Sequence, residues 1–164
     1  MKRRRPRLRL TVQYAVASEG LPAAASLRRW ARAALSRDAA VTLRFVDEAE
    51  GRELNRRFRR RDRATNVLAF VYHEGRTHGI DGDVVLCVPV MRREAEEQGK
   101  LLTAHSAHLV IHAMLHLQGY DHSHAAEAAR MEVREVAILT RLGFPDPYAA
   151  RTSSRKRRAP RTAR

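Results

Sequence analysis

The sequence predicts an α+β fold in which a small mixed β-sheet of about four strands is covered by about five helices. Short runs rich in β-branched and aromatic residues are interleaved irregularly with longer segments whose apolar residues recur every three or four positions. The chain has 164 residues, of which 44% are hydrophobic, so it is long enough to bury one sizeable core. We therefore expect one domain rather than several.

Four segments have the pattern of strands. Leu8, Leu10, Val12, Tyr14 and Val16 alternate with mostly polar residues, as in a strand with one buried face. Three further runs are short and apolar, and they occupy residues 41–46, 66–72 and 83–88. A glycine-rich loop is expected between the last two, over residues 73–82.

The first two helices have clear start signals. Pro22 opens a helix to about residue 35, in which Trp30 lies on the apolar stripe and is expected in the core. Asp47 can cap a second helix that ends at about residue 58. The residues expected to face inward on this second helix are Ala49, Leu54 and Phe58.

Three more helices follow in the second half of the chain. One begins at Pro89 and stops before Gly99, and the next begins at Thr103 and carries several histidines. The last is expected over residues 124–142, where Gly143 ends it.

The formal net charge of +14 lies mostly at the two ends of the chain. Residues 1–9 and 151–164 contain basic residues and no acidic ones, whereas residues 10–150 are nearly balanced. We expect a basic flexible arm at residues 1–7, a single domain at residues 8–150 and a basic disordered tail at residues 151–164. Such ends either contact nucleic acid or another polyanion, or remain passive in solvent.

The remaining bulk properties predict a soluble, cytoplasmic protein with no membrane partner. No apolar run approaches the roughly 18–20 residues that span a bilayer, and no apolar segment with a cleavage site follows the basic N-terminus. Cys87 is the single cysteine, which excludes an internal disulfide and fits a reducing compartment.

The stretch HAMLHLQGYDH, residues 112–122, has the spacing of metal ligands. His112 and His116 are four residues apart, so a helix presents both imidazoles on one face. Gly119 can then turn the chain back, so that His122 closes the site. His108 and His112 form an equally good pair on spacing alone, but only the later pair can use this turn. His124 is the alternative to His122 as the third ligand.

Three neutral imidazoles would leave one open position on a tetrahedral zinc ion, which is typical of catalytic sites. Structural zinc sites are closed by four ligands that usually include cysteine, and this chain has one cysteine. Ala113 occupies the position where zinc proteases of similar spacing carry their glutamate base, which disfavours peptide hydrolysis. Phosphodiester hydrolysis demands that base less, and seven arginines within residues 52–63 could supply cations for phosphate.

Several separate stretches together resemble the YbeY family of bacterial endoribonucleases, which are ribosomal RNA maturation factors. The similarity covers roughly residues 8–150, in the order and spacing of the family. The stretches that carry it are LNRRFRRRDRATNVLAF (54–70), GDVVLC (82–87), EAEEQGK (94–100), AHLVIHAMLHLQGYDH (107–122) and LGFPDPY (142–148).

The resemblance implies a fold of a small mixed sheet with surrounding helices, and one Zn²⁺ ion held by His112, His116 and His122 at the end of a central helix. Three imidazoles also suit Ni, Cu or Co. The resemblance further implies that Arg59, in the segment F-R-x-x-D-x-x-T-N-V-L, acts in cleavage of single-stranded RNA. Four neighbouring arginines are expected to hold the RNA backbone, and they are Arg56, Arg60, Arg61 and Arg63.

The resemblance implies a role in ribosomal RNA processing, notably at the 3′ end of the small-subunit rRNA, and in ribosome quality control. Ribosomal RNA and the ribosome or its small-subunit proteins would then be the partners. Two positions depart from the family pattern, because Ala113 and Arg60 stand where the family usually has glycine. The second change could alter the loop after Arg59 or add a phosphate contact.

Two alternatives remain open from the sequence. The chain could be a non-catalytic RNA-binding or ribosome-binding assembly factor whose metal ion stabilises the fold. It could also be a metallohydrolase of another substrate, such as a peptide or a small phosphoester.

Overall fold

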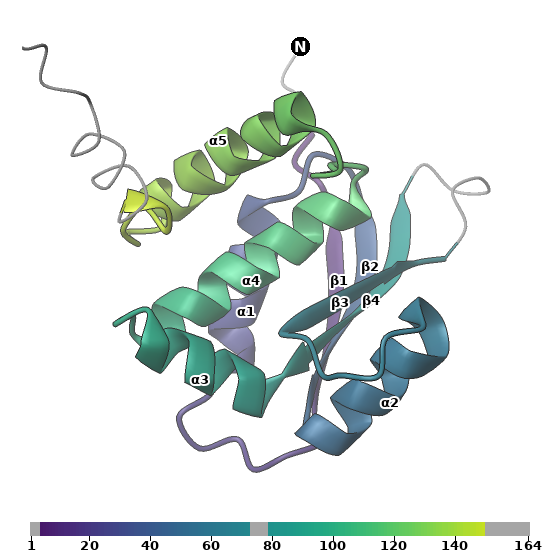
Figure 1. Cartoon of the computed structure of the whole chain (residues 1–164). Helices are drawn as coiled ribbons and strands as arrows, with labels where there is room; N and C mark the ends of the chain where they lie inside the picture. The colour runs from purple at the N-terminus through teal and green to yellow at the C-terminus, as the bar shows by residue number, and fades with distance from the viewer. Residues whose placement is uncertain (1–3, 73–78, 150–164) are drawn as a thin grey trace, which may run out of the picture.

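The structure is a computed structural model that describes residues 4–72 and 79–149 of the chain. A four-stranded mixed sheet forms its centre, with the strand order β1-β2-β4-β3 (Figure 1). β1, β2 and β4 are parallel, and β3 is antiparallel to β4 at one edge. The strands are β1 (Leu8–Tyr14), β2 (Ala39–Val46), β3 (Val67–Val71) and β4 (Ile80–Cys87).

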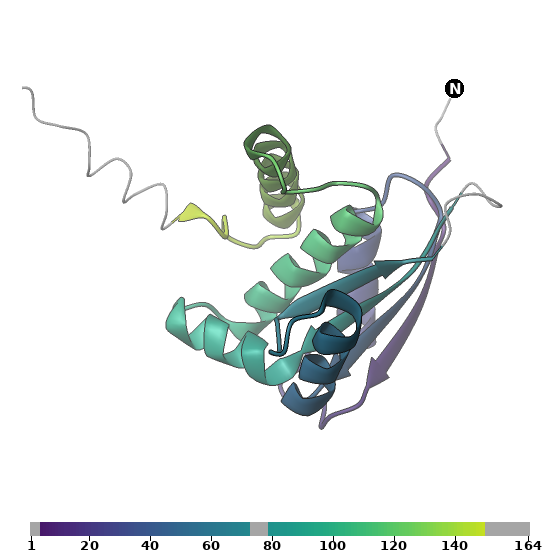
Figure 2. The same cartoon turned by 45° about the vertical axis from the view of Figure 1, so that its right-hand side comes forward.

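Helices cover both faces of the sheet, which confirms the α+β prediction (Figure 2). On β4, Val84 and Leu86 point into the main core, which also contains apolar residues of α1, α3 and α4. Val85 and Cys87 point to the opposite face, where α2 packs. The helices are α1 (Ala24–Ala33), α2 (Glu48–Arg59), α3 (Val88–Glu97), α4 (Leu102–Leu117) and α5 (Ala125–Arg141).

The helix α4 lies against the sheet and α1 on one side and contacts α5 on the other (Figure 1). Of its 16 residues, Leu109, Val110, Ile111 and Met114 are among those buried in the main core. Trp30 of α1 is also 1% exposed, so its expected place in the core is confirmed. This packing holds α4 in a fixed position. The side chains that α4 presents at the edge of the core are therefore held in place as well.

The strand β4 begins earlier than the sequence pattern predicts. It starts at Ile80 rather than at residue 83, and Val88 belongs to α3 rather than to the strand. Gly82 was expected in a loop but lies inside the strand, where a Cβ atom would come within 2.6 Å of the Phe70 carbonyl oxygen and 2.9 Å of Leu117 Cδ2. The close approach of a neighbouring strand and of α4 therefore requires glycine there. Residues 73–78 of the expected loop lie outside the described residues.

The inward face of α2 matches the expected one only at Leu54, which is half-buried and packs against the buried residues of the sheet. Asp47 caps the helix as predicted, because its Oδ1 accepts a hydrogen bond of 2.8 Å from the Glu50 backbone N–H. Ala49 and Phe58 are nevertheless exposed, and the buried positions are Gly51 and Asn55. The prediction assumed that the apolar side chains of α2 face the sheet. The sheet surface beneath α2 instead packs against a glycine and a hydrogen-bonded amide.

The expected basic arm and tail lie partly outside the described residues. Of the arm, residues 4–7 are described, and Arg4 Nη2 forms an ion pair of 2.7 Å with Asp38. Residues 1–3 and 150–164 are not described. Within residues 4–72 and 79–149, no helix combines the length and the hydropathy needed to cross a membrane.

Candidate active site

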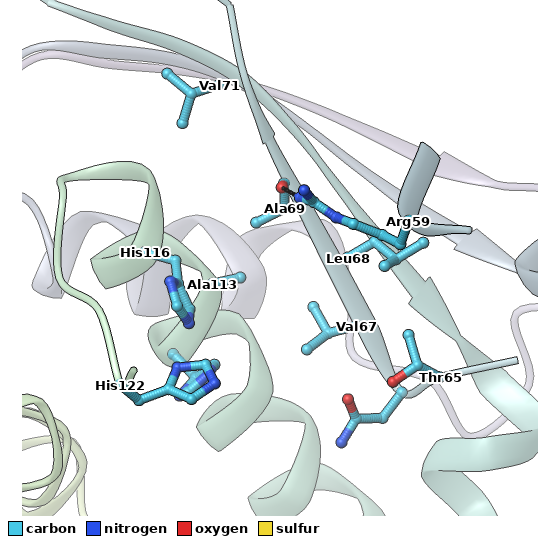
Figure 3. A pocket seen from close by; sticks show the side chains of 11 residues that line it. Arg59, Thr65, Val67, Leu68, Ala69, Val71, Ala113, His116 and His122 are labelled. Atoms are coloured by element: carbon cyan, nitrogen blue, oxygen red, sulfur yellow. Dashed lines mark hydrogen bonds between the residues drawn. The ribbon is translucent and has the colours of Figure 1, made fainter. Parts of the chain in front are cut away.

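Three histidines converge at the C-terminal end of α4. His112 and His116 lie one turn apart on the helix, with ring centroids separated by 4.8 Å. His122 approaches His116 from the loop that follows (Figure 3). The His122 centroid is 4.8 Å from that of His116 and 5.6 Å from that of His112. One ring nitrogen of each residue lies within 4.8 Å of the others, so the group can hold a metal ion.

The loop that carries His122 is shaped by local contacts. Gly119 has φ +95°, a conformation that side chains disfavour, and it turns the chain at the end of α4. Asp121 Oδ1 accepts hydrogen bonds from the backbone N–H groups of His122, at 2.7 Å, and of Ser123, at 3.3 Å. Asp121 therefore stabilises the turn that carries His122.

The other histidines near this motif have different environments. His105 Nε2 lies 2.7 Å from a Glu94 carboxylate oxygen, and His108 Nε2 lies 2.9 Å from a Glu135 carboxylate oxygen. His124 is the N-cap of α5. The stripe of histidines on α4 is thus divided between carboxylates at its beginning and the three-histidine group at its end.

The environment keeps His116 uncharged at neutral pH. Burial lowers its pKa from 6.5 to about 4, and repulsion by charge on His112 and His122 adds to the effect. A neutral imidazole is the form that binds a metal ion. Three imidazole nitrogens suit zinc and leave one coordination position open.

The three histidines form one wall of a cavity of about 380 Å³. Figure 3 shows the opposite wall, which is built by β3 and the segment before it, with the Arg59 side chain reaching across to Ala69 of the strand. Ala113 also lines the cavity on the histidine side, so the position that holds glutamate in zinc proteases contributes only a methyl group here. The lining residues of the opposite wall are Arg59, Thr65, Asn66, Val67, Leu68, Ala69 and Val71.

Arg59 is the last residue of α2, and its side chain crosses to β3. Its Nη2 donates a hydrogen bond of 2.8 Å to the Ala69 carbonyl oxygen, and its guanidinium lies 5.3 Å from the centre of the Phe70 ring. These two contacts hold the cation on the cavity wall facing the histidines. The sequence placed Arg59 and the histidines about fifty residues apart, and the fold brings them to one cavity.

The four neighbouring arginines expected to hold RNA have three different environments. Arg61 and Arg63 line a second hollow of about 360 Å³, which shares Arg59 and His122 with the first. Arg56 instead pairs with Glu53 at 2.8 Å on the exposed side of α2. Arg60 ends the helix in the left-handed conformation, with φ 57°.

The position of Asn66 is fixed by a carboxylate. Its Nδ2 donates to both Glu94 carboxylate oxygens, at 3.0 and 3.2 Å, and the same carboxylate contacts His105 of α4. Glu94 therefore joins the segment before β3 to the helix that carries the histidines. Asn66 therefore fixes the segment that enters β3.

Glu135 of α5 was missed by the sequence reasoning. Its side chain is fully buried and contacts His108, His112 and the Tyr148 hydroxyl. Burial alone would raise the pKa of Glu135, but the hydrogen bonds from these three groups outweigh it and lower the pKa to about 2. The only sequence signal was an acidic residue at a position of α5 that faces α4, and spacing alone did not separate it from Glu127 and Glu132 of the same helix.

The family model described as Endoribonuclease YbeY matches residues 20–143. The chain belongs to this family. Two YbeY relatives, both named Endoribonuclease YbeY, come from Aromatoleum aromaticum and Thiobacillus denitrificans. The first is 57% identical over 87% of this chain and 94% of its own length, and the second is 53% identical over 87% and 97%.

A solved structure supports the fold of this YbeY family member. The solution structure of TM1509 from Thermotoga maritima covers 96% of this chain and 99% of its own, with a TM-score of 0.51 and 23% identity. The resemblance inferred from the sequence motifs is therefore confirmed at the level of family and fold. The roles of the three histidines as metal ligands and of Arg59 in cleavage stay predictions, and all four residues line one cavity.

Proposed function

We propose that this chain is a metal-dependent, single-strand-specific endoribonuclease in ribosomal RNA processing, acting at the 3′ end of the small-subunit rRNA and in ribosome quality control. Membership of the Endoribonuclease YbeY family supports the reaction class, an RNA phosphodiester hydrolase. One observation carries the proposal further: the three histidines and Arg59 line the same cavity. The proposal places the protein in the cytoplasm, with ribosomal RNA and the ribosome as partners.

His112, His116 and His122 would hold the ion in this proposal. Their nitrogens lie close enough together, and the low pKa of His116 suits a ligand at neutral pH. When bound, a zinc ion or a similar divalent ion supplies Lewis-acid chemistry that activates water and polarises phosphoryl oxygens. The rigid attachment of α4 to the core keeps two of the three ligands in place without the ion.

Arg59 stabilises the negative charge that develops on the phosphoryl oxygens. The guanidinium is permanently charged and has five N–H donors, of which the hydrogen bond to Ala69 uses one. The part of the chain that the structure describes places no other hydrogen-bond acceptor on Arg59, so its other donors can reach a phosphate in the cavity, and their positions are set before the substrate arrives. Ala113 leaves room there and supplies no base, which fits an RNA substrate better than a peptide.

Arg61 and Arg63 hold the RNA backbone next to the cavity. They line the adjoining hollow with Arg59 and His122, so a bound strand can run from one hollow into the other. Arg56 contributes less to RNA binding, because its charge is paired with Glu53. Recognition by phosphate contacts is independent of base identity, so sequence choice would come from the ribosomal partner.

The first prediction concerns Arg59. In a zinc-loaded cleavage assay on single-stranded RNA that spans the 3′ end of the small-subunit rRNA, Arg59→Ala lowers kcat by about 10²- to 10³-fold, the cost of removing one electrostatic stabiliser. Its metal content stays at the wild-type level. Arg57→Ala is the matched control, since Arg57 is an exposed arginine of the same helix turn and lies outside the cavity. It retains near wild-type cleavage.

The same assay separates the alternatives. Wild-type cleavage by Arg59→Ala would refute the role of Arg59. If the wild-type protein bound RNA without cleaving it, and His116→Ala bound equally well, a non-catalytic assembly factor would be the better description. Turnover of a peptide library with no action on RNA would favour another metallohydrolase. Annealing a complementary strand to the substrate tests strand specificity, and cleavage should then fall.

A further inference from the structure

The carboxylate of Glu135 lies directly behind the three-histidine group. The side chain comes from α5 and is 0% exposed. Its Oε1 is hydrogen-bonded to His112 Nδ1, and its Oε2 is hydrogen-bonded to His108 Nε2, at 2.9 Å, and to the Tyr148 hydroxyl. Burying an isolated carboxylate costs much free energy, and the hydrogen bonds from these three partners offset that cost.

The same atoms could be read as a second metal group, because His108, His112 and Glu135 offer ligand atoms within 4.8 Å of one another. Direct hydrogen bonds between the carboxylate and both rings argue against that reading, since they already use the nitrogens that would face an ion. His112 is the one residue common to both groups. Its two ring nitrogens can therefore serve different partners, one the carboxylate and the other the histidine cluster.

An ionised carboxylate only accepts hydrogen bonds, so the ring nitrogen that contacts Glu135 must carry the proton. That nitrogen is Nδ1 of His112. The neutral ring then has its lone pair on Nε2, the nitrogen that is left for a metal ion beside His116 and His122. Tyr148 and His108 hold the other carboxylate oxygen, which prevents the carboxylate from rotating away.

We propose that Glu135 is a positioning residue, which fixes the Nδ1–H tautomer and the ring orientation of His112 so that its Nε2 is presented to the ion, with Tyr148 steadying the carboxylate. The inference rests on the proposed metal site. Carboxylates behind metal-bound histidines make the imidazole a better ligand, and their loss typically lowers metal affinity about 10- to 100-fold. The inference also gives α5 and Tyr148, which lie outside the cavity lining, a part in the reaction.

The test compares Glu135→Gln, Tyr148→Phe and the matched control Glu127→Gln, which changes an exposed glutamate of the same helix. Zinc affinity is measured by competition with a chromogenic chelator. We expect about a 10- to 100-fold weaker affinity for Glu135→Gln, a smaller loss for Tyr148→Phe and no change for Glu127→Gln. The nitrogen chemical shifts of the His112 ring, recorded on the metal-free protein, should report the Nδ1–H tautomer in the wild type and a mixture in Glu135→Gln.

A purely structural role for Glu135 would lower the unfolding temperature of the metal-free protein and leave zinc affinity and the tautomer unchanged. That result would overturn the inference. If Glu135→Gln did not fold, the Tyr148→Phe variant would decide by the same two measurements, and wild-type values for both would count against the proposal. If the wild-type protein bound no zinc, the proposed metal site would fail, while the tautomer measurement would still decide whether Glu135 orients His112.

Discussion

His116 is a buried imidazole whose pKa is lowered from 6.5 to about 4, chiefly by burial. Between these two pH values the unfolded chain carries a proton on His116 that the folded protein lacks, so acid favours unfolding. For the metal-free protein we expect full stability above pH 6.5, and a loss that grows to about 3 kcal/mol as pH falls towards 4. Urea unfolding at a series of pH values measures this slope.

His116→Gln is the control for this prediction, because it removes the titrating group. The stability of this variant should vary less between pH 6.5 and 4, and equal slopes in both proteins would contradict the assigned cause.

Glu135 affects stability in a lower pH range. Its pKa falls from 4.5 to about 2, so its contribution is present above pH 4.5 and is lost only as pH drops towards 2. The two groups can therefore be separated in one titration.

The residues of the histidine cluster could be predicted because their positions are encoded locally. The spacing of His112 and His116 fixes their common face, and Gly119 supplies the turn that returns His122. Glu135 could not be predicted in this way. Its contact with His112 depends on how α5 lies against α4, and the sequence contains no local signal for the packing of two helices that a loop joins.

At the scale of a single element, the end of α2 carries a strained residue. Arg60 is the only non-glycine residue with positive φ among the described residues, and its N–H caps the helix through the Arg56 carbonyl oxygen at 3.1 Å. Glycine is favoured in this conformation because it has no Cβ. We therefore expect Arg60→Gly to raise the free energy of unfolding by about 1 kcal/mol.

Chemical denaturation measures this change, with Arg61→Gly as the control because Arg61 has no positive φ. The control should be neutral or destabilising, and a destabilised Arg60→Gly would show that the strain argument is wrong. RNA affinity measured on the same two variants adds a second result. If Arg60 also binds phosphate, Arg60→Gly gains stability and loses affinity, which would explain why arginine occupies a position suited to glycine.

The elements themselves were largely predictable, because apolar periodicity, caps and glycine stops are local properties. The errors occur where two elements touch. The sequence pattern predicts a loop at Gly82, since only the neighbouring Phe70 carbonyl and Leu117 explain a glycine inside a strand. The buried face of α2 was misassigned because Asn55 is satisfied by a hydrogen bond of 2.7 Å to the Arg63 carbonyl oxygen, a contact formed only after folding.

At the scale of the whole molecule, positive charge is concentrated outside the nearly neutral body. We expect a truncated protein of residues 4–149 to keep its stability and metal content but to bind single-stranded RNA more weakly at low salt. The truncation retains Arg4, because that residue pairs with Asp38. Fluorescence anisotropy at a series of salt concentrations should give a smaller slope of log affinity against log salt for the truncated protein.

The comparison needs the full chain under the same conditions. A slope equal to that of the full chain would show that the terminal charges are passive. The remaining affinity of the truncated protein would then belong to the body, and Arg61→Ala and Arg63→Ala should reduce it, since both residues line the hollow beside the cavity. In this way the contributions of the ends and of the cavity rim are measured separately.

The two walls of the cavity come from distant parts of the chain and from different layers of the fold. One wall needs β3 to pair with β4 at the edge of the sheet, and the other needs α4 to pack on the core. A partly synthesised or partly folded chain therefore has no assembled cavity and cannot cut RNA by this mechanism. Under the proposed function, a chain that is still on the ribosome therefore has no activity towards ribosomal RNA until its own folding is complete.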